Sequence, residues 1–281
     1  MGISLGILLA LACVICWSVA GLVTKLALDG ASKWKVLFFS QLFSGVVILI
    51  VGWLLGSFGK LGSDALFWII GFGIFNLAIM YSFYEAMRVK GVALTSSIVN
   101  SWPFVTTILG AIFYHELVKN SQVIAIALIL AGILAITFKN SKLVFDNSFL
   151  FAVLAMLLWG FFLFALKIPV SIFGIVLVTS GINLVTSVTA LPFAVLNKVN
   201  LFETKLKVLV AILLVGFFNA LGFLAYVFGI VNAPISIVAP IVSAVPALSA
   251  VLAVVLLKEK LTRQQCIGIV VTVIGICLIT L

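Results

Sequence analysis

Long uncharged apolar stretches constrain this chain more than any other feature. Residues 92–114 form one such stretch, with no charged side chain anywhere in it. A helix of about 20 residues crosses a hydrocarbon core of about 30 Å, whereas a membrane β-strand alternates apolar and polar residues over about ten positions. Every backbone N–H and C=O in lipid must be bonded within the chain. Continuous apolar runs of this length therefore predict membrane-spanning helices.

The composition agrees with a lipid environment. Hydrophobic residues make up 65% of the 281 residues and charged residues 8%, against about 45–50% and about 25% in soluble domains. The net charge of +9 comes from cations that sit in short loops. We interpret these cations as determinants of membrane topology and as partners of anionic lipid headgroups rather than of nucleic acid. We predict a multi-pass protein of the plasma or inner membrane.

The predicted fold class is an all-α membrane protein with ten transmembrane helices. Breaks in hydropathy delimit the spans 3–28, 35–55, 66–87, 92–114, 121–138, 149–167, 172–196, 208–229, 235–257 and 264–281. The first run is longer than a signal-peptide core and is interpreted as a retained helix. Thr262 and Gln265 predict a capping box at the start of the last span.

An internal repeat divides the chain into residues 1–140 and 141–281. An offset of 143 residues aligns Pro103 with Pro246 and Glu116 with Glu259, and an offset of 142 aligns Lys25 with Lys167. Chance similarity between apolar helices does not pair polar residues and prolines in this way. Five helices per half is an odd number, so the second half must enter the membrane from the opposite side. Such inverted repeats build a midplane site with two alternating faces in many secondary transporters.

The distribution of cations gives a prediction of orientation. Thirteen of the 16 Lys and Arg residues fall after the odd-numbered spans, and only Lys60, Lys119 and Lys167 fall on the other side. The positive-inside rule then places both termini outside the cytoplasm.

The repeated set of motifs resembles the drug/metabolite transporter superfamily, in its EamA-like branch. It consists of Pro103 to Glu116 with Gly132, then Pro246 to Glu259 with Gly275, and of the aromatic pair Tyr81 and Tyr84. The resemblance implies a basket of ten helices around a central cavity, lined by the first, third, fourth, sixth, eighth and ninth. It implies transport of metabolites or drugs without naming the substrate. It also implies cytoplasmic termini, which the charge bias contradicts, so the orientation stays open.

Polar and aromatic residues within the spans are the candidates for contact with a substrate in the cavity. For each, the alternative is a role in packing or in bonding helices to one another. The candidates are Trp17, Asn76, Tyr81, Tyr84, Asn100, Trp102, Trp159, Asn219 and Tyr226.

Glu85 is the candidate for coupling transport to protons, because desolvation raises the pKa of a membrane carboxyl. The alternative is an ion pair with Arg88 at i,i+3. Pro103, Pro240 and Pro246 are candidate hinges, because each removes a backbone donor and frees a carbonyl one turn earlier. Packing kinks are the alternative.

The remaining charged and sulfur-bearing residues suggest structural roles. We expect Glu116 and Glu259 to bond N–H groups at the start of the next helix. Lys25 and Lys167 either hold an anionic substrate or extend to the membrane surface. The four cysteines lie in apolar segments, and the single His115 excludes a site with several histidines. We expect no metal and no cofactor.

These features favour a secondary transporter that moves a small solute by alternating access and is not an enzyme. The sequence contains no G-x-x-x-x-G-K-[ST] run, so ATP drive would require a partner protein. An intramembrane enzyme would need converging catalytic groups, and a receptor or scaffold would not explain the inverted duplication. Both remain as alternatives, and the sequence leaves open whether the bundle forms a homodimer.

Overall fold

A computed structural model describes residues 2–59, 61–90, 98–116, 119–137, 147–257 and 262–279, and these residues contain helices and no strand. The helices are α1 (Gly2–Gly30), α2 (Lys33–Leu55), α3 (Ser63–Lys90), α5 (Trp102–Phe113), α6 (Asn120–Thr137), α7 (Asn147–Ala165), α8 (Lys167–Phe173), α9 (Ile175–Leu196), α10 (Leu206–Asn232), α11 (Ile235–Val242), α12 (Val245–Leu257) and α13 (Arg263–Ile279).

Seven helical segments in the described part of the chain are long and apolar enough to cross a membrane. They are α1, α2, α3, α7 with α8, α9, α10, and α11 with α12; α5, α6 and α13 are apolar but shorter. The prediction of an all-helical membrane protein is confirmed, because local hydropathy decides both the helix and its lipid environment. The count of ten crossings stays a prediction.

The predicted capping box at the last span is present. The backbone N–H of Thr262 donates to the Gln265 side chain (2.9 Å), and the backbone N–H of Gln265 donates to the Thr262 hydroxyl (3.3 Å). At the start of α6, the backbone N–H of Lys119 donates to Gln122 in the same way (2.9 Å). Both halves therefore begin their last helix by satisfying otherwise free N–H groups with a glutamine.

The helices pack in a pattern that is unchanged when the two halves are exchanged. The contact of α1 with α10 has its counterpart in the contact of α7 with α3, and α2 contacts α10 as α9 contacts α3. Likewise, α5 packs on α7 as α11 and α12 pack on α1. The pairs α2–α9 and α6–α13 join each helix to its own counterpart, and α5 packs on α11, which belongs to the span that is the counterpart of its own. This is the contact pattern of two units related by a pseudo-twofold axis.

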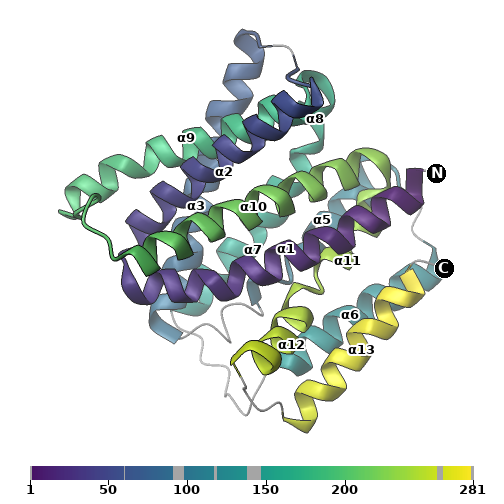
Figure 1. Cartoon of the computed structure of the whole chain (residues 1–281). Helices are drawn as coiled ribbons and strands as arrows, with labels where there is room; N and C mark the ends of the chain where they lie inside the picture. Colours follow the sequence, from purple (N-terminus) through teal and green to yellow (C-terminus); the bar gives the residue numbers. More distant parts are fainter. Residues whose placement is uncertain are drawn as a thin grey trace.

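Counterpart helices run antiparallel where they meet. Along the α2–α9 pair, a Cβ placed on Gly45 would lie 2.8 Å from Leu184, and one on Gly52 would lie 2.3 Å from Val176. The residue number falls in α9 as it rises in α2, so the two helices point in opposite directions. Figure 1 shows α2 with α9 on one side of the bundle and α6 with α13 on the other.

The α6–α13 pair is held by an approach that only small residues permit. A Cβ on Gly132 would lie 2.3 Å from the Thr272 hydroxyl and 2.6 Å from the Gly268 carbonyl oxygen. Helices in lipid gain most from such close backbone packing, because lipid tails are as apolar as their side chains. Gly132 therefore stands where a larger residue would separate the two helices.

Candidate functional site

Two helix breaks face each other across the pseudo-twofold axis. The predicted span 235–257 is interrupted by a turn at Ser243 and Ala244, which separates α11 from α12. The predicted span 92–114 carries a turn at Asn100 and Ser101, directly before α5. These positions are repeat counterparts, and α11 packs against α5. Both halves therefore place irregular backbone where α5 and α11 meet.

The backbone follows the same course through both breaks. The N–H of Ser101 donates to the Ile98 carbonyl, and the N–H of Ala244 donates to the Ile241 carbonyl, both at 3.1 Å. These i→i−3 bonds replace the α-helical pattern. A proline follows two residues after each turn, Pro103 in the first turn of α5 and Pro246 in the first turn of α12. Proline lacks an N–H, so it suits the first turn of a helix and disrupts a helix interior.

A small pocket lies beside the breaks. Its lining includes Pro103 and Phe104 from α5, Pro240 from α11, and Ser243 in the turn, with Ile126, Ile129 and Leu130 of α6 closing the other side. The three candidate hinges thus divide into two that start helices and Pro240, which lies inside α11. Their movement as hinges stays a prediction.

Three aromatic candidates from three helices come together beside the break before α5. Trp17 of α1 stacks on Tyr226 of α10 with ring centroids 6.0 Å apart, and Trp102 meets both rings edge-on at 6.5 and 5.8 Å. We call Trp17, Trp102 and Tyr226 the aromatic cluster. A Cβ on Gly222 would lie 2.4 Å from the Trp17 ring. The absence of a side chain at Gly222 therefore lets the indole lie against α10.

The hydroxyl of Tyr226 is a buried polar group. Tyr226 is fully buried, and its hydroxyl oxygen forms no hydrogen bond to any described residue. Leaving a buried hydroxyl unpaired costs about 1–3 kcal/mol in proteins. A buried group that carries this cost at the interface of two halves is a candidate for bonding a ligand.

The other half contains the counterpart of the Trp17–Tyr226 stack. Trp159 of α7 contacts Phe83 of α3 with ring centroids 5.8 Å apart, and these residues align with Trp17 and Tyr226 in the repeat. Phe83 lacks the hydroxyl, and the counterpart of Trp102 is Val245. The pair Trp159 and Phe83 therefore reproduces the ring contact but has neither the third ring nor the hydroxyl of the aromatic cluster.

The remaining cavity candidates are not members of the aromatic cluster. Asn76 is buried, and its amide donates to the Thr186 hydroxyl of α9 (3.1 Å). Tyr81 is 41% exposed and stacks on Trp34. Asn219 of α10 is half-buried. Asn100 is half-buried in the first break. The side chains of Tyr84 and Glu85 lie outside the described residues.

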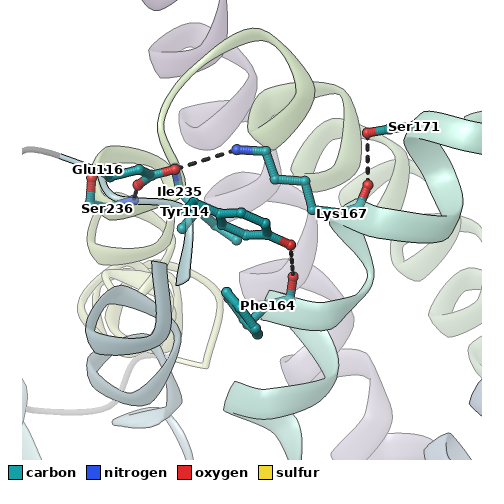
Figure 2. Close-up of polar contacts among 7 residues, drawn as sticks. All are labelled: Tyr114, Glu116, Phe164, Lys167, Ser171, Ile235 and Ser236. Carbon is teal, nitrogen blue, oxygen red and sulfur yellow. Dashed lines mark hydrogen bonds and ion pairs between the residues drawn. The ribbon is translucent and has the colours of Figure 1, made fainter. Parts of the chain in front are cut away.

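One carboxylate joins the two halves at the end of α5. Glu116 accepts hydrogen bonds from the backbone N–H groups of Ile235 (3.0 Å) and Ser236 (2.8 Å), and the Lys167 ammonium lies 3.4 Å away (Figure 2). Tyr114 completes the arrangement: its hydroxyl donates to the Phe164 carbonyl (3.3 Å), and its ring lies 4.8 Å from the Lys167 ammonium. We call Glu116, Lys167 and these two N–H groups the Glu116 clamp.

The clamp corrects one expectation from the sequence. Glu116 does bond N–H groups at a helix start, but the helix is α11 of the other half rather than the next helix along the chain. The direction of a side chain after a helix end is set by packing, which the sequence repeat does not encode. Glu259, its counterpart, lies outside the described residues. Lys167, which the sequence offered as a residue for an anionic substrate or for the membrane surface, pairs with the Glu116 carboxylate in this structure.

The electrostatics favour an ionised Glu116. Burial opposes ionisation, but the hydrogen bonds from Ser236 and Ile235 and the charge of Lys167 outweigh it, so the pKa of the Glu116 carboxyl lies below its ordinary value. The first turn of α11 adds the partial positive charge of a helix N-terminus. The clamp is therefore a fixed pair of opposite charges.

Comparison with known proteins agrees with the repeat. Two segments, residues 4–138 and 147–281, each match the model of the EamA-like transporter family. A solved structure described only as "Crystal structure of protein" superposes with a TM-score of 0.85, at 17% sequence identity and covering 98% of each chain. At this identity the likeness concerns the fold alone. No curated protein matches the sequence.

Proposed function

Because this multi-pass chain belongs to the EamA-like transporter family, we propose that it carries a small metabolite or drug-like solute across the plasma or inner membrane by alternating access. The solute binds between the two halves, at the paired helix breaks and the aromatic cluster. One half then rocks against the other and exposes the solute to each side in turn. The observation that carries this proposal is the pair of counterpart breaks at residues 100–101 and 243–244.

Broken helices suit a solute site in a membrane for a physical reason. Unbonded backbone groups are costly in lipid and are tolerated only where protein or a polar cavity meets them. Half-helices in many transporters present such groups to a substrate near the midplane. Here the breaks come with a buried Tyr226 hydroxyl that has no hydrogen-bond partner in the described part of the chain, which supplies a further polar contact at the same interface.

Alternating access requires the halves to be inverted relative to each other. The antiparallel packing of α2 with α9 and of α6 with α13 supports this arrangement. Both ends of the chain lie on the same side of the bundle in Figure 1, as an even number of crossings such as ten would place them. Impermeant labelling of single cysteines introduced at Lys207 and Lys60 decides the orientation: labelling of Lys60→Cys alone from outside favours external termini.

Proton coupling through Glu85 belongs to the same proposal. If Glu85 exchanges the coupling proton, Glu85→Gln abolishes the pH dependence of flux while the protein still binds its solute. An unchanged pH dependence would leave only a structural ion pair for this residue.

Uptake into proteoliposomes, with a panel of radiolabelled metabolites and organic drugs, tests the transport proposal. We expect saturable flux of at least one solute class, and we expect Trp17→Ala to reduce it at least about tenfold, equivalent to about 1.4 kcal/mol. Trp68→Ala is the matched control, because Trp68 contacts Phe72 rather than the aromatic cluster. Absence of flux for every solute, with folded protein in the liposomes, would refute the proposal.

A further inference from the structure

The Glu116 clamp lies at one end of the bundle, away from the helix breaks. The 12 residues of α5 separate Glu116 from the first break, a rise of about 18 Å. Ile235 and Ser236 begin α11, whose eight residues end at the second break, a rise of about 12 Å. The clamp therefore lies at the far ends of α5 and α11 from the helix breaks.

The clamp connects parts that move separately if the halves rock. Glu116 belongs to the first half, and Lys167 together with the start of α11 belongs to the second. The Glu116 and Lys167 side chains are 10% and 25% exposed, so water screens them less than it screens a surface pair. Bonds from a carboxylate to N–H groups and to an ammonium are also stronger than bonds between neutral groups.

We propose that the Glu116 clamp is a gate that holds this end of the solute path closed and must break before the end can open. The proposal rests on the proposed function and adds the residues that close one face. Opening this end means that α11 moves away from the end of α5, and Glu116 then loses both N–H groups and Lys167 together. The gate thereby favours the conformation seen here over the one that is open at this face.

Cys13 offers a native reporter for the gate. It is fully buried in α1, one helical turn before Trp17. The N-terminal part of α1 runs alongside the end of α10, where a Cβ on Gly6 would lie 3.2 Å from the Gly229 carbonyl oxygen. Since α11 follows α10 after two residues, Cys13 lies between the clamp end of the bundle and the aromatic cluster. Reagents that enter through an opened clamp reach this thiol.

The experiment measures labelling of Cys13 by an impermeant methanethiosulfonate reagent in lipid nanodiscs, with Cys16, Cys266 and Cys277 replaced by Ala. We expect Glu116→Gln to raise the labelling rate about tenfold, which corresponds to about 1.4 kcal/mol. Lys167→Met removes the ion pair and the contact of the ammonium with the Tyr114 ring but keeps both N–H bonds to Glu116, and it should raise the rate by a smaller factor. Glu203→Gln is the matched control, because the exposed Glu203 contributes only its backbone carbonyl to the contact with Lys35.

Two outcomes overturn the gate. One is a Glu116→Gln protein that labels as slowly as the Glu203→Gln control, and the other is a Lys167→Met protein that labels as slowly as the parent. If Glu116→Gln does not yield folded protein, the Lys167→Met result decides alone. Faster labelling without any measurable flux would keep the gate and refute transport, whereas flux with unchanged labelling would keep transport and refute the gate.

Discussion

Gln41 of α2 and Asn183 of α9 occupy equivalent positions in the two halves, and each buries an amide atom that has no hydrogen-bond partner among the described residues. The offset of 142 residues that aligns Trp17 with Trp159 also aligns this pair. The unpaired atoms are Gln41 Oε1 and Asn183 Nδ2. Helices α2 and α9 pack against each other. Each helix of this pair therefore carries one buried amide atom without a partner among the described residues.

This relationship predicts a stabilising substitution. Gln41→Met keeps the length of the side chain and removes the unpaired amide, so we expect the free energy of unfolding to rise by about 1 kcal/mol. Asn76→Leu is the contrasting variant, because it removes an amide that is bonded to Thr186 and should lower stability. Thermal unfolding in detergent micelles measures both. A lower melting temperature for Gln41→Met would contradict the assignment of its amide as unpaired.

Gly222 controls the position of Trp17. We expect Gly222→Ala to displace the indole, because the added Cβ would lie 2.4 Å from the ring, and to cost about 1–3 kcal/mol as overpacking does. Tryptophan fluorescence and thermal unfolding report the change. Gly71→Ala in α3 is the matched control: nothing lies within 4 Å of its added Cβ, so the better helix former should stabilise slightly. Equal effects at the two positions would refute the packing argument.

The Tyr226 hydroxyl gives a prediction that separates function from stability. Tyr226→Phe removes a buried group that has no partner among the described residues, so stability should stay the same or rise. If the hydroxyl bonds the solute, the same variant raises the KM for uptake about tenfold, or about 1.4 kcal/mol. Parallel unfolding and uptake measurements test this. Unchanged uptake would remove Tyr226 from the binding site.

The Glu116 clamp predicts an acid-dependent loss of stability. The pKa of Glu116 is lower in the folded protein than its ordinary value, which is about 4.3. Its stabilisation is therefore complete above the unfolded-state pKa and is lost as pH falls through the lower folded-state pKa. Melting temperatures between pH 7 and pH 3 should fall less in Glu116→Gln than in the parent. Identical profiles would show that the clamp does not contribute.

The helices and their repeat were predictable because their causes are local. Hydropathy along 20 residues decides whether a segment enters lipid, and the Thr262–Gln265 cap is formed by residues three positions apart. Of the three candidate hinges, Pro103 and Pro246 lie two residues after the breaks, where a missing N–H suits a helix start, whereas Pro240 lies inside α11. The predicted span 235–257 carries two of these prolines, and the turn at Ser243 and Ala244 divides it between them.

The site required information that is not local. The sequence singled out Trp17, Trp102 and Tyr226 separately, among other candidates of equal standing. Their meeting depends on the contacts of α1 with α10 and on the small residue at Gly222. Gln41 and Asn183 were missed altogether, although their alignment in the repeat is visible to inspection, because a buried amide without a partner is recognised only once its surroundings are known.

By itself, the sequence determined that this chain is a duplicated bundle of membrane helices, because hydropathy and repetition are properties of the chain's order. The tertiary structure decided which polar groups are satisfied and by whom. Glu116 shows the difference. The sequence predicts that this carboxylate, at a helix end, bonds N–H groups at the start of another helix. Only the packing of α5 against α11 selects Ile235 and Ser236, more than a hundred residues away, because a hydrogen bond depends on position in space and not on distance along the chain.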